Sequence, residues 1–245
     1  MQKTEEKEIS LVSTPLTKQP TVSIIVPAYN EEATLAAVLD RLLALPLDSQ
    51  IIVVDDCSKD RTGEIAKSYG DKIIYYRQPK NSGKGAAIRA GLQKATGVVS
   101  IIQDADLEYR PEEISSVIQP ILDGKSDVCY GSRFMKGMSK GMALPNKVVN
   151  VLLRWSVAAL FFQRLTDEAT CYKAFKTDVL KRMNLVCNRF EFCPEATAKA
   201  IRMGHKIIEV PISYEPRGKE EGKKIRWTDG VEAFWTLFRH RFSKF

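Results

Sequence analysis

The feature that most constrains this chain is a short apolar run that ends abruptly in acidic residues. The segment Val-Val-Ser-Ile-Ile at 98–102 follows a glycine and predicts a strand, buried in a sheet, that ends at Asp104. Asp104 and Asp106 are two positions apart, so an extended backbone points both the same way, and Glu108 extends the row if the backbone stays extended. Because ligands of open α/β sheets bind beyond the carboxyl ends of the strands, we expect a binding site here.

The chemistry of this acidic row suggests a metal ion. Hard carboxylate oxygens suit Mg²⁺ or Mn²⁺, held jointly by the protein and a substrate diphosphate. An isolated Asp-x-Asp pattern is short, however, and a polar loop start gives the same two residues. The remaining strand ends have to decide between these interpretations.

Over the first 131 residues, apolar runs that predict strands alternate with segments whose periodicity predicts helices. This alternation predicts a mostly parallel, Rossmann-like α/β sheet flanked by helices. One helix is expected to begin near Glu31, with Asn30 as its N-cap. The expected strands are 22–27, 51–56, 72–77, 98–104 and 127–131, and further helices are expected over 64–69, over 86–95 and from Pro111.

The second half of the chain has a different pattern. An amphipathic helix over 148–165 is either core or lies on a membrane face. A final amphipathic helix over 227–245 mixes Trp and Phe with Arg and presents the same two alternatives. Between them we expect a strand over 172–175, a helix over 195–203 closed by Gly204, an edge strand over 206–214 and a charged loop over 215–226.

Charge and composition limit the classes of partner and compartment. The net charge of +7 and a pI near 9.1 indicate an anionic partner: nucleic acid, a phosphate-bearing substrate or a membrane surface. The five cysteines form no C-x-x-C pair, which favours a reducing compartment and argues against structural zinc. The N-terminus is polar rather than signal-like, and no apolar run is long enough to span a bilayer. We therefore expect a cytoplasmic protein.

Three predicted strands end in polar residues at comparable places, namely Tyr29-Asn30-Glu31, Asp55-Asp56 and Asp104-Ala105-Asp106. In a parallel sheet these ends line one crevice. A nucleotide fits there with Tyr29 beside its base, an early carboxylate on base or ribose, and the acidic pair beneath its diphosphate.

These motifs, taken in order, resemble the family 2 glycosyltransferases of the GT-A fold, and within them the polyprenyl-phosphate sugar synthases of the dolichol-phosphate mannosyltransferase type. The likeness covers about residues 21–214, more loosely to the end. It rests on Val26–Glu31, Val53–Asp56, Asn81–Ala87, Asp104–Leu107, Gly131–Phe134, Thr166-Asp167, Cys171–Phe175 and Glu209–Ile212.

The resemblance implies roles for particular residues. It places Pro27, Ala28, Tyr29, Glu31 and Asp56 in the nucleotide pocket, with Lys84 as a further nucleotide contact. Asp104 and Asp106 would bind the metal, with Glu108 where relatives often have Gln. Arg133 would meet phosphate near the acceptor, Asp167 would lie on the acceptor side, and Arg217 and Lys224 would close over the diphosphate.

The chain is expected to have three parts. Residues 1–20 show no apolar period and are expected to be a flexible tail, the resemblance makes 21–215 the GT-A domain, and the charge and apolar pattern of 216–245 predict a basic loop followed by the C-terminal amphipathic helix. The family usually has Asp-Asp-Gly-Ser and then Asp-Gly-Thr after the second strand, whereas Cys57 and Arg61 replace the glycines here. This puts the local backbone shape in question, because glycine adopts positive φ at little cost.

The predicted chemistry is consistent with a lipid phosphate acceptor. A hydroxyl acceptor needs a base to take its proton, whereas a polyprenyl monophosphate is already anionic near neutral pH. Neither His205 nor His240 lies in a motif, but cations are abundant. We expect direct displacement with inversion at the anomeric carbon, the leaving nucleoside diphosphate being stabilised by the metal and by Lys84, Arg133, Arg217, Lys223, Lys224 and Arg226.

Several features have a second interpretation. Asn81-Ser82-Gly83-Lys84-Gly85 is either a phosphate loop, although it lacks G-x-x-x-x-G-K-[ST], or a structural turn that starts a helix. The segment 217–226 is either a mobile lid or merely solvated, and Asp167 is either near the acceptor or a helix-end charge.

The leading function is therefore an inverting, metal-dependent hexosyltransferase using GDP- or UDP-mannose or -glucose and a polyprenyl (dolichyl or undecaprenyl) phosphate. We expect it peripherally at the cytoplasmic face of a membrane, with a membrane partner protein possible. A glycolipid or polysaccharide acceptor, or nucleotide binding without catalysis, is the alternative. The acidic pair argues against nucleic-acid binding, and no G-x-G-x-x-G follows the first strand to indicate a dinucleotide oxidoreductase.

Overall fold

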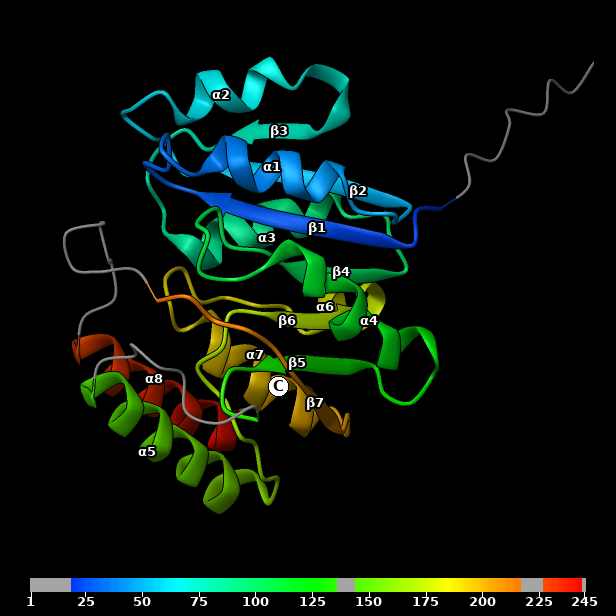
Figure 1. Ribbon diagram of the computed structural model, residues 1–245. Coiled ribbons are helices and arrows are strands. Elements are labelled where there is room, and N and C mark those ends of the chain that lie inside the picture. The colour runs from blue at the N-terminus through cyan, green and yellow to red at the C-terminus, as the bar shows by residue number, and fades with distance from the viewer. Residues whose placement is uncertain (1–18, 136–143, 217–226, 244–245) are drawn as a thin grey trace, which may run out of the picture.

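A single seven-stranded sheet flanked by helices forms the centre of the molecule (Figure 1). The structure is a computed structural model that describes residues 19–135, 144–216 and 227–243. The strands are β1 (Val22–Ala28), β2 (Ser49–Asp55), β3 (Ile74–Arg77), β4 (Val99–Ile102), β5 (Val128–Ser132), β6 (Lys173–Lys176) and β7 (Ile207–Pro211).

The strand order is β3-β2-β1-β4-β6-β5-β7, and every pairing is parallel except those of β6, which is antiparallel to both β4 and β5. The prediction of a mostly parallel α/β sheet is confirmed, and β7 is an edge strand as expected.

The helices are α1 (Leu35–Leu43), α2 (Thr62–Ser68), η1 (Gly70–Lys72), α3 (Lys84–Lys94), η2 (Pro111–Glu113), α4 (Ile114–Leu122), α5 (Leu144–Phe161), α6 (Thr177–Arg182), α7 (Phe192–Arg202) and α8 (Trp227–Phe242).

The sheet is covered on both faces, which explains the continuous apolar runs of its central strands. Ile24 and its alternate neighbours pack with α1, α2 and α4, whereas Ile25 and its alternate neighbours pack with α3 and α5 to α8. α8 belongs to this second layer through Ala233 and Leu237. No helix in the described ranges is both long and apolar enough to cross a membrane.

Several expected boundaries are wrong: the helix expected over 148–165 is α5 at Leu144–Phe161, the strand expected over 206–214 ends at Pro211, and two more errors lie at the functional edge. The first helix begins at Leu35 rather than near Glu31, because Asn30 takes a left-handed φ of 52° and its side chain accepts from the Lys59 amide instead of capping a helix. β4 ends at Ile102, and the chain bends from Ala105 onward, so Glu108 does not extend an acidic row in a straight strand.

The backbone after β2 keeps the shape that glycine favours, although glycine is absent. Cys57 has φ of 62°, a region that costs a side-chain-bearing residue roughly 1–2 kcal/mol. Arg61 instead has an ordinary φ of −78° just before α2. The substitution of Cys57 for the family's glycine is therefore accommodated by local strain and not by a different turn.

Candidate active site

The carboxyl ends of β1, β2 and β4 meet at one edge of the sheet, and their loops are tied together by hydrogen bonds. The Glu31 amide donates to Thr62 Oγ1 at 2.8 Å, which joins the loop after β1 to the loop after β2. Thr34 Oγ1 donates to the Ala105 carbonyl at 2.9 Å, which joins the loop after β1 to the loop after β4. These bonds bring the three predicted polar strand ends into one region.

β1 and β4 separate at this edge of the sheet. Their pairing ends at Ile25 opposite Ile102, and the Gln103 amide still donates to the Ile25 carbonyl at 3.0 Å. Pro27 lies two residues further on the same side of β1, where no strand remains to accept a hydrogen bond, so its missing N–H carries no penalty. The order of the strands reverses between β1 and β4, and ligand crevices of doubly wound sheets lie at such a point.

Lys84 lies against Asp104 at this crevice. Its ammonium forms a salt bridge with Asp104 and donates to Cys171 Sγ at 3.1 Å. Burial alone would lower the pKa of Lys84, but the Asp104 carboxylate raises it well above its usual range, so the side chain is cationic. The side chains of Lys84 and Asp104 keep 17% and 13% of their surface exposed, which leaves the pair within reach of a ligand.

Asp106 and Glu108 lie on the bend that follows. Asp106 Oδ1 accepts from the Glu108 amide at 3.1 Å, and Glu108 Oε2 accepts from the Tyr214 hydroxyl at 3.0 Å. Asp104 and Asp106 lie close together in sequence after β4. Their carboxylate oxygens are ligands of the kind that a hard divalent cation prefers. Whether Glu108 joins them stays a prediction, since its carboxylate is turned toward Tyr214.

Asp56 is buried and holds the loop that starts α3. Its carboxylate accepts from the amides of Ser82 and Gly83 at 2.7 Å each and from Gln78 Nε2 at 2.8 Å. Burial raises the pKa of Asp56, and the two amide donors oppose this rise. The structure thus gives Asp56 a clear role in fixing the segment before Lys84, and its predicted contact with a nucleotide stays a prediction.

The amino end of α3 is closed by a loop over residues 187–189. The Gly85 amide donates to the Arg189 carbonyl at 3.1 Å and the Ala86 amide to the Asn188 carbonyl at 3.0 Å. A methyl group at Gly83 would lie 2.5 Å from the Asn188 carbonyl oxygen, so this position has no room for a side chain. The amides of this glycine-rich segment are therefore engaged by the protein, which favours the structural turn over the phosphate loop.

Arg133 and Asp167 form a buried, two-pronged ion pair at the end of β5. Arg133 Nε and Nη2 lie 2.6 Å and 2.8 Å from the two Asp167 oxygens, and the Arg133 amide donates to Asp167 Oδ2 at 3.0 Å. Burial would lower the pKa of Arg133, but Asp167 raises it well above its usual range. The Arg133 guanidinium also lies 5.0 Å from the centre of the Tyr214 ring, a cation–π distance.

Glu209 on β7 holds the segment that carries Asp167. It accepts from the Thr166 amide at 2.6 Å, the Thr166 hydroxyl at 2.9 Å and the Asp167 amide at 2.9 Å. Asp167 is thus a partner of Arg133 and is not a helix-end charge. Glu209 lies in a motif, but the sequence gives no sign that it supports Asp167.

Two tyrosines connect the pairs at β4 and β5. Tyr109 accepts from the Cys171 amide at 3.2 Å, and its ring lies 5.4 Å from that of Tyr214. Because Cys171 contacts Lys84 and Tyr214 contacts Arg133, the two cations belong to one continuous site. Sequence reasoning missed both tyrosines; their signal is weak, since a lone aromatic near a strand end is usually core.

Comparison with known proteins agrees with this geometry. The family model described as "Glycosyl transferase family 2" matches residues 23–183. The chain belongs to glycosyltransferase family 2. Its mostly parallel sheet and crevice are those of the GT-A fold of this family.

Relatives along most of the chain are named for transfer to lipid phosphates. A UDP-N-acetylglucosamine–dolichyl-phosphate N-acetylglucosaminyltransferase of Methanococcus voltae is 33% identical, over 91% of this chain and 97% of that protein. A dolichol-phosphate mannosyltransferase of Pyrococcus furiosus is 30% identical, over 82% of this chain and 58% of that protein. A polyprenol monophosphomannose synthase of Mycolicibacterium smegmatis is 29% identical, over 95% of this chain and 94% of that protein.

Among solved structures, a glucosyl-3-phosphoglycerate synthase of Mycobacterium tuberculosis, in complex with Mn²⁺, UDP and glucosyl-3-phosphoglycerate, is similar with a TM-score of 0.68. It is 21% identical, over 90% of this chain and 80% of that one, so the likeness concerns the fold. The predicted family and fold are both confirmed by these comparisons.

The remaining predicted residues fall into two groups. Ala28 and Glu31 are buried at and just after the end of β1, and Tyr29 is half-buried between them, so all three border the crevice. Arg217 and Lys224 lie outside the described residues. A pocket of about 540 Å³ beside α3 is lined by none of the predicted site residues, although Asn81, Ser82 and Ala86 of the motif Asn81–Ala87 line it.

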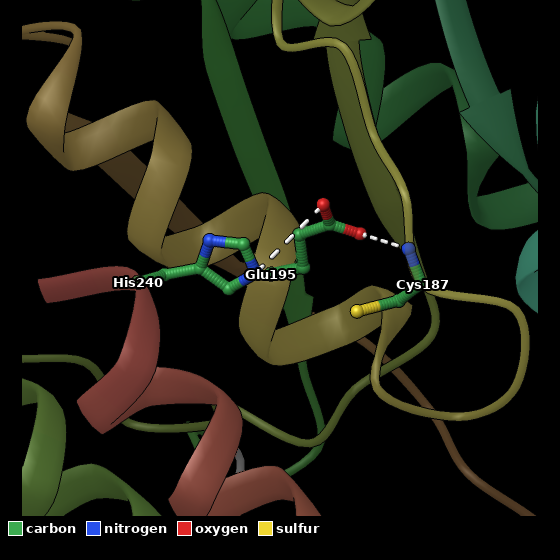
Figure 2. Close-up of side chains that lie close together, drawn as sticks. All are labelled: Cys187, Glu195 and His240. Carbon is green, nitrogen blue, oxygen red and sulfur yellow. Dashed lines mark hydrogen bonds and ion pairs between the residues drawn. The ribbon is translucent and has the colours of Figure 1, made fainter. Parts of the chain in front are cut away.

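A second cluster lies away from the crevice. Among the described residues, the one trio of His, Cys, Asp or Glu whose ligand atoms all lie within 4.8 Å of one another is Cys187, Glu195 and His240, shown in Figure 2. Glu195 is fully buried, accepts from the amides of Val186 and Cys187 at 2.8 Å each, and pairs with Lys199 at 2.8 Å. The positive charge of Lys199 disfavours a metal cation at this cluster. We therefore interpret the cluster as structural, with Glu195 fastening the loop 186–189 to α7.

His240 brings α8 to the same point. Its Nε2 lies 3.8 Å from Glu195 Oε1. Burial lowers the pKa of His240, opposed by the charge of Glu195 and assisted by Lys199, Arg239 and Arg202. The neutral imidazole is therefore the form that the folded protein favours.

Proposed function

We propose that this chain transfers a sugar from a nucleoside-diphosphate donor to a polyprenyl phosphate, with inversion at the anomeric carbon. The observation that carries the proposal is the continuous site in which Lys84 with Asp104, and Arg133 with Asp167, flank the crevice beyond β4. Two buried cations suit a reaction in which both substrates carry phosphate. The full-length relatives named for dolichyl- and polyprenyl-phosphate transfer support the acceptor class.

On the donor side, Asp104 and Asp106, with Glu108 as the proposed third ligand, would hold Mg²⁺ or Mn²⁺. A divalent cation bound there would neutralise the negative charge of the diphosphate when the nucleoside diphosphate leaves. Pro27, Ala28, Tyr29, Glu31 and Asp56 are the proposed wall of the nucleotide pocket. The similar structure named with Mn²⁺ and UDP supports a divalent metal and a nucleotide donor for this fold.

On the acceptor side, Arg133 is the proposed contact of the lipid phosphate, held in place by Asp167. No proton has to be removed from a phosphate monoanion or dianion, so its oxygen attacks without a general base. The two histidines agree with this: His205 lies 3.0 Å from Asp127, at the other end of β5, and His240 faces Glu195. Arg217 and Lys224 are proposed to close over the diphosphate.

The acceptor class also suggests where the protein works. A polyprenyl phosphate resides in a bilayer, so we place the chain peripherally on the cytoplasmic face of a membrane, with or without a membrane partner protein. The five cysteines, none of them in a disulfide, agree with a reducing compartment. The donor is GDP- or UDP-linked, and mannose, glucose and N-acetylglucosamine are the sugars to test.

The decisive experiment offers purified protein each labelled donor, GDP-mannose, UDP-glucose and UDP-N-acetylglucosamine, with a polyprenyl phosphate in detergent and Mg²⁺ or Mn²⁺. We expect one donor to label an organic-soluble, mild-acid-labile product. Asp104→Asn should abolish the labelling, and chelation of divalent ions should do the same. The matched control is Asp123→Asn, because Asp123 pairs with Lys125 on the surface after α4.

Two outcomes would contradict the proposal. Label in a water-soluble product, for example with 3-phosphoglycerate as acceptor, would replace the lipid with a different phosphate-bearing acceptor. Failure of every donor to bind, measured by calorimetry with Mn²⁺ present, would refute transfer from these sugars altogether.

A further inference from the structure

The exposed side of α5 is apolar along its whole length. Every exposed position of this helix whose side chain the structure describes carries Ala, Val, Leu or Trp. Leu144 and Trp155 are the most exposed, at 73% each, and Phe162 just beyond the helix is exposed at 86%. The buried side contains Leu153 and Val157 together with Asn150 and Ser156, so the helix packs on the core but does not present the polar outer side that a helix facing water usually has. The exposed positions are Leu144, Val148, Val151, Leu152, Trp155 and Ala159.

α8 has a similar outer side. Val231, Phe234, Trp235, Phe238 and Phe242 are exposed at helical spacing, Trp235 at 60%. The ring of Trp235 lies 5.8 Å from that of Phe238, which in turn lies 5.0 Å from that of Phe242, so the aromatic side chains form a row on the surface. Side chains of this size that remain exposed at neighbouring positions indicate a surface that another phase or molecule covers.

The two helices lie side by side and present their apolar sides together. Figure 1 shows α5 and α8 next to each other at the β7 end of the sheet, both beginning on the side toward which β1 points. A methyl group at Gly230 would lie 2.9 Å from Val149 Cγ1, so the glycine permits their close approach. Their inner sides share one core through Leu153, Val157 and Leu237. We call the exposed sides of α5, Phe162 and α8 the apolar face.

Exposure of large apolar side chains is concentrated on this face. Of the seventeen large hydrophobic side chains exposed in the described ranges, eleven belong to it. Hydrophobic side chains exposed singly over a surface are normal, whereas a group of them on two adjacent helices is typical of an interaction surface. The face needs an occupant.

We propose that the apolar face docks on the surface of a bilayer that contains anionic lipid. The choice of a bilayer rests on the proposed polyprenyl phosphate acceptor, since α5 and α8 both begin on the side of the sheet where the crevice lies. Its composition agrees: two tryptophans, which prefer the boundary between headgroups and acyl chains, are accompanied by Lys147, Arg239 and Arg241. Among the side chains of α5 and α8 that the structure describes, Glu232 is the acidic one exposed beside them. The net charge of +7 adds attraction to anionic lipid.

The test measures partition of the full chain onto sedimented vesicles of phosphatidylcholine, with and without phosphatidylglycerol. We expect stronger binding to the anionic vesicles, and a loss of roughly tenfold or more in the double variant Trp155→Gln, Trp235→Gln. Both side chains are mainly exposed, so the variant should keep the wild-type unfolding midpoint. The control is Leu122→Gln at the end of α4, 40% exposed and away from the face, which should bind like wild type.

Transfer assays separate this proposal from the proposed function. The double variant should keep wild-type transfer to acceptor dispersed in detergent and lose it for acceptor embedded in vesicles. Vesicle binding without any transfer would contradict the function and leave the docking surface supported. Equal vesicle binding by wild type and double variant would overturn the docking proposal. It would also be overturned if the wild type bound no vesicles and instead formed a concentration-dependent dimer, seen by ultracentrifugation, that the double variant did not form.

Discussion

The glycine at position 85 allows a sharp test of how the amino end of α3 is held. A methyl group there would lie 2.5 Å from the Cys187 carbonyl oxygen and 3.0 Å from that of Arg189. Both are backbone atoms that cannot rotate away. Gly85→Ala should therefore push the loop 187–189 from α3 and break the bonds from the Gly85 and Ala86 amides.

The magnitude follows from these contacts. Two lost hydrogen bonds remove about 1 kcal/mol each. Crowding in a packed region costs about 1–3 kcal/mol, and the better helix propensity of alanine returns about 1 kcal/mol. The free energy of unfolding should thus fall by about 2–4 kcal/mol, measured by urea denaturation followed by circular dichroism. The KM for the donor should also rise, since Lys84 moves with the segment.

Gly70→Ala is the matched control, because Gly70 has φ of 54° with nothing within 4 Å of an added methyl group. It should lose only the roughly 1–2 kcal/mol of the left-handed conformation and keep the wild-type KM. If Gly85→Ala had wild-type stability and only weakened donor binding, the loop contacts would be irrelevant. The segment would then act as a phosphate loop after all.

Three further predictions concern the ion pairs and the buried histidine. Asp167→Asn should lower the free energy of unfolding by about 3–5 kcal/mol, because it leaves the Arg133 guanidinium buried without its counter-charge. In the double variant Arg133→Met, Asp167→Leu most of this loss should disappear. A double variant that lost as much as the two single substitutions together would refute the pairing. Glu209→Ala should raise the KM for the acceptor more than that for the donor, since it releases the segment that holds Asp167; equal changes in steady-state assays would contradict this role. The pKa of His240 is lowered on folding from its usual 6.5, so the unfolded chain binds the proton more readily and stability should fall as the pH drops through about 6.5. Urea denaturation at about pH 7.5 and about pH 5.5 should show a smaller difference in His240→Gln than in wild type, and an unchanged difference would exclude His240 as a source of this slope.

Much of the fold and the acidic part of the site could be predicted from sequence, because their causes are local. Buried parallel strands need apolar runs, and a ligand edge needs polar residues where such runs stop. Asp104 and Tyr29 fall at these stops, and the structure brings both to the same edge. The helix start at Glu31 was wrong because Asn30 bonds to the Lys59 amide, 29 residues away.

Contacts that depend on distant segments could not be predicted. β6 runs antiparallel, which places its amino end, and with it Cys171, at the edge where the parallel strands finish. The loop 187–189 reaches α3 across about a hundred residues, and its carbonyls explain Gly83 and Gly85. A single sequence offers no pattern for such pairings, since each involves backbone atoms that every residue possesses.

The charges of the site give the proposed function an internal consistency. Lys84 and Arg133 are each neutralised by one aspartate, so the two pairs together bring almost no net charge to the crevice. Asp106 and Glu108 add negative charge beside them. A nucleoside diphosphate and a lipid phosphate together bring roughly three or more further negative charges, which a low-dielectric crevice tolerates only with counter-charge. Lys84 and Arg133 can contact the phosphates while they stay paired, but their charge is already offset by their aspartates, so further counter-charge is needed. The proposed divalent ion on Asp104 and Asp106, and the proposed closure of Arg217 and Lys224, would supply this counter-charge.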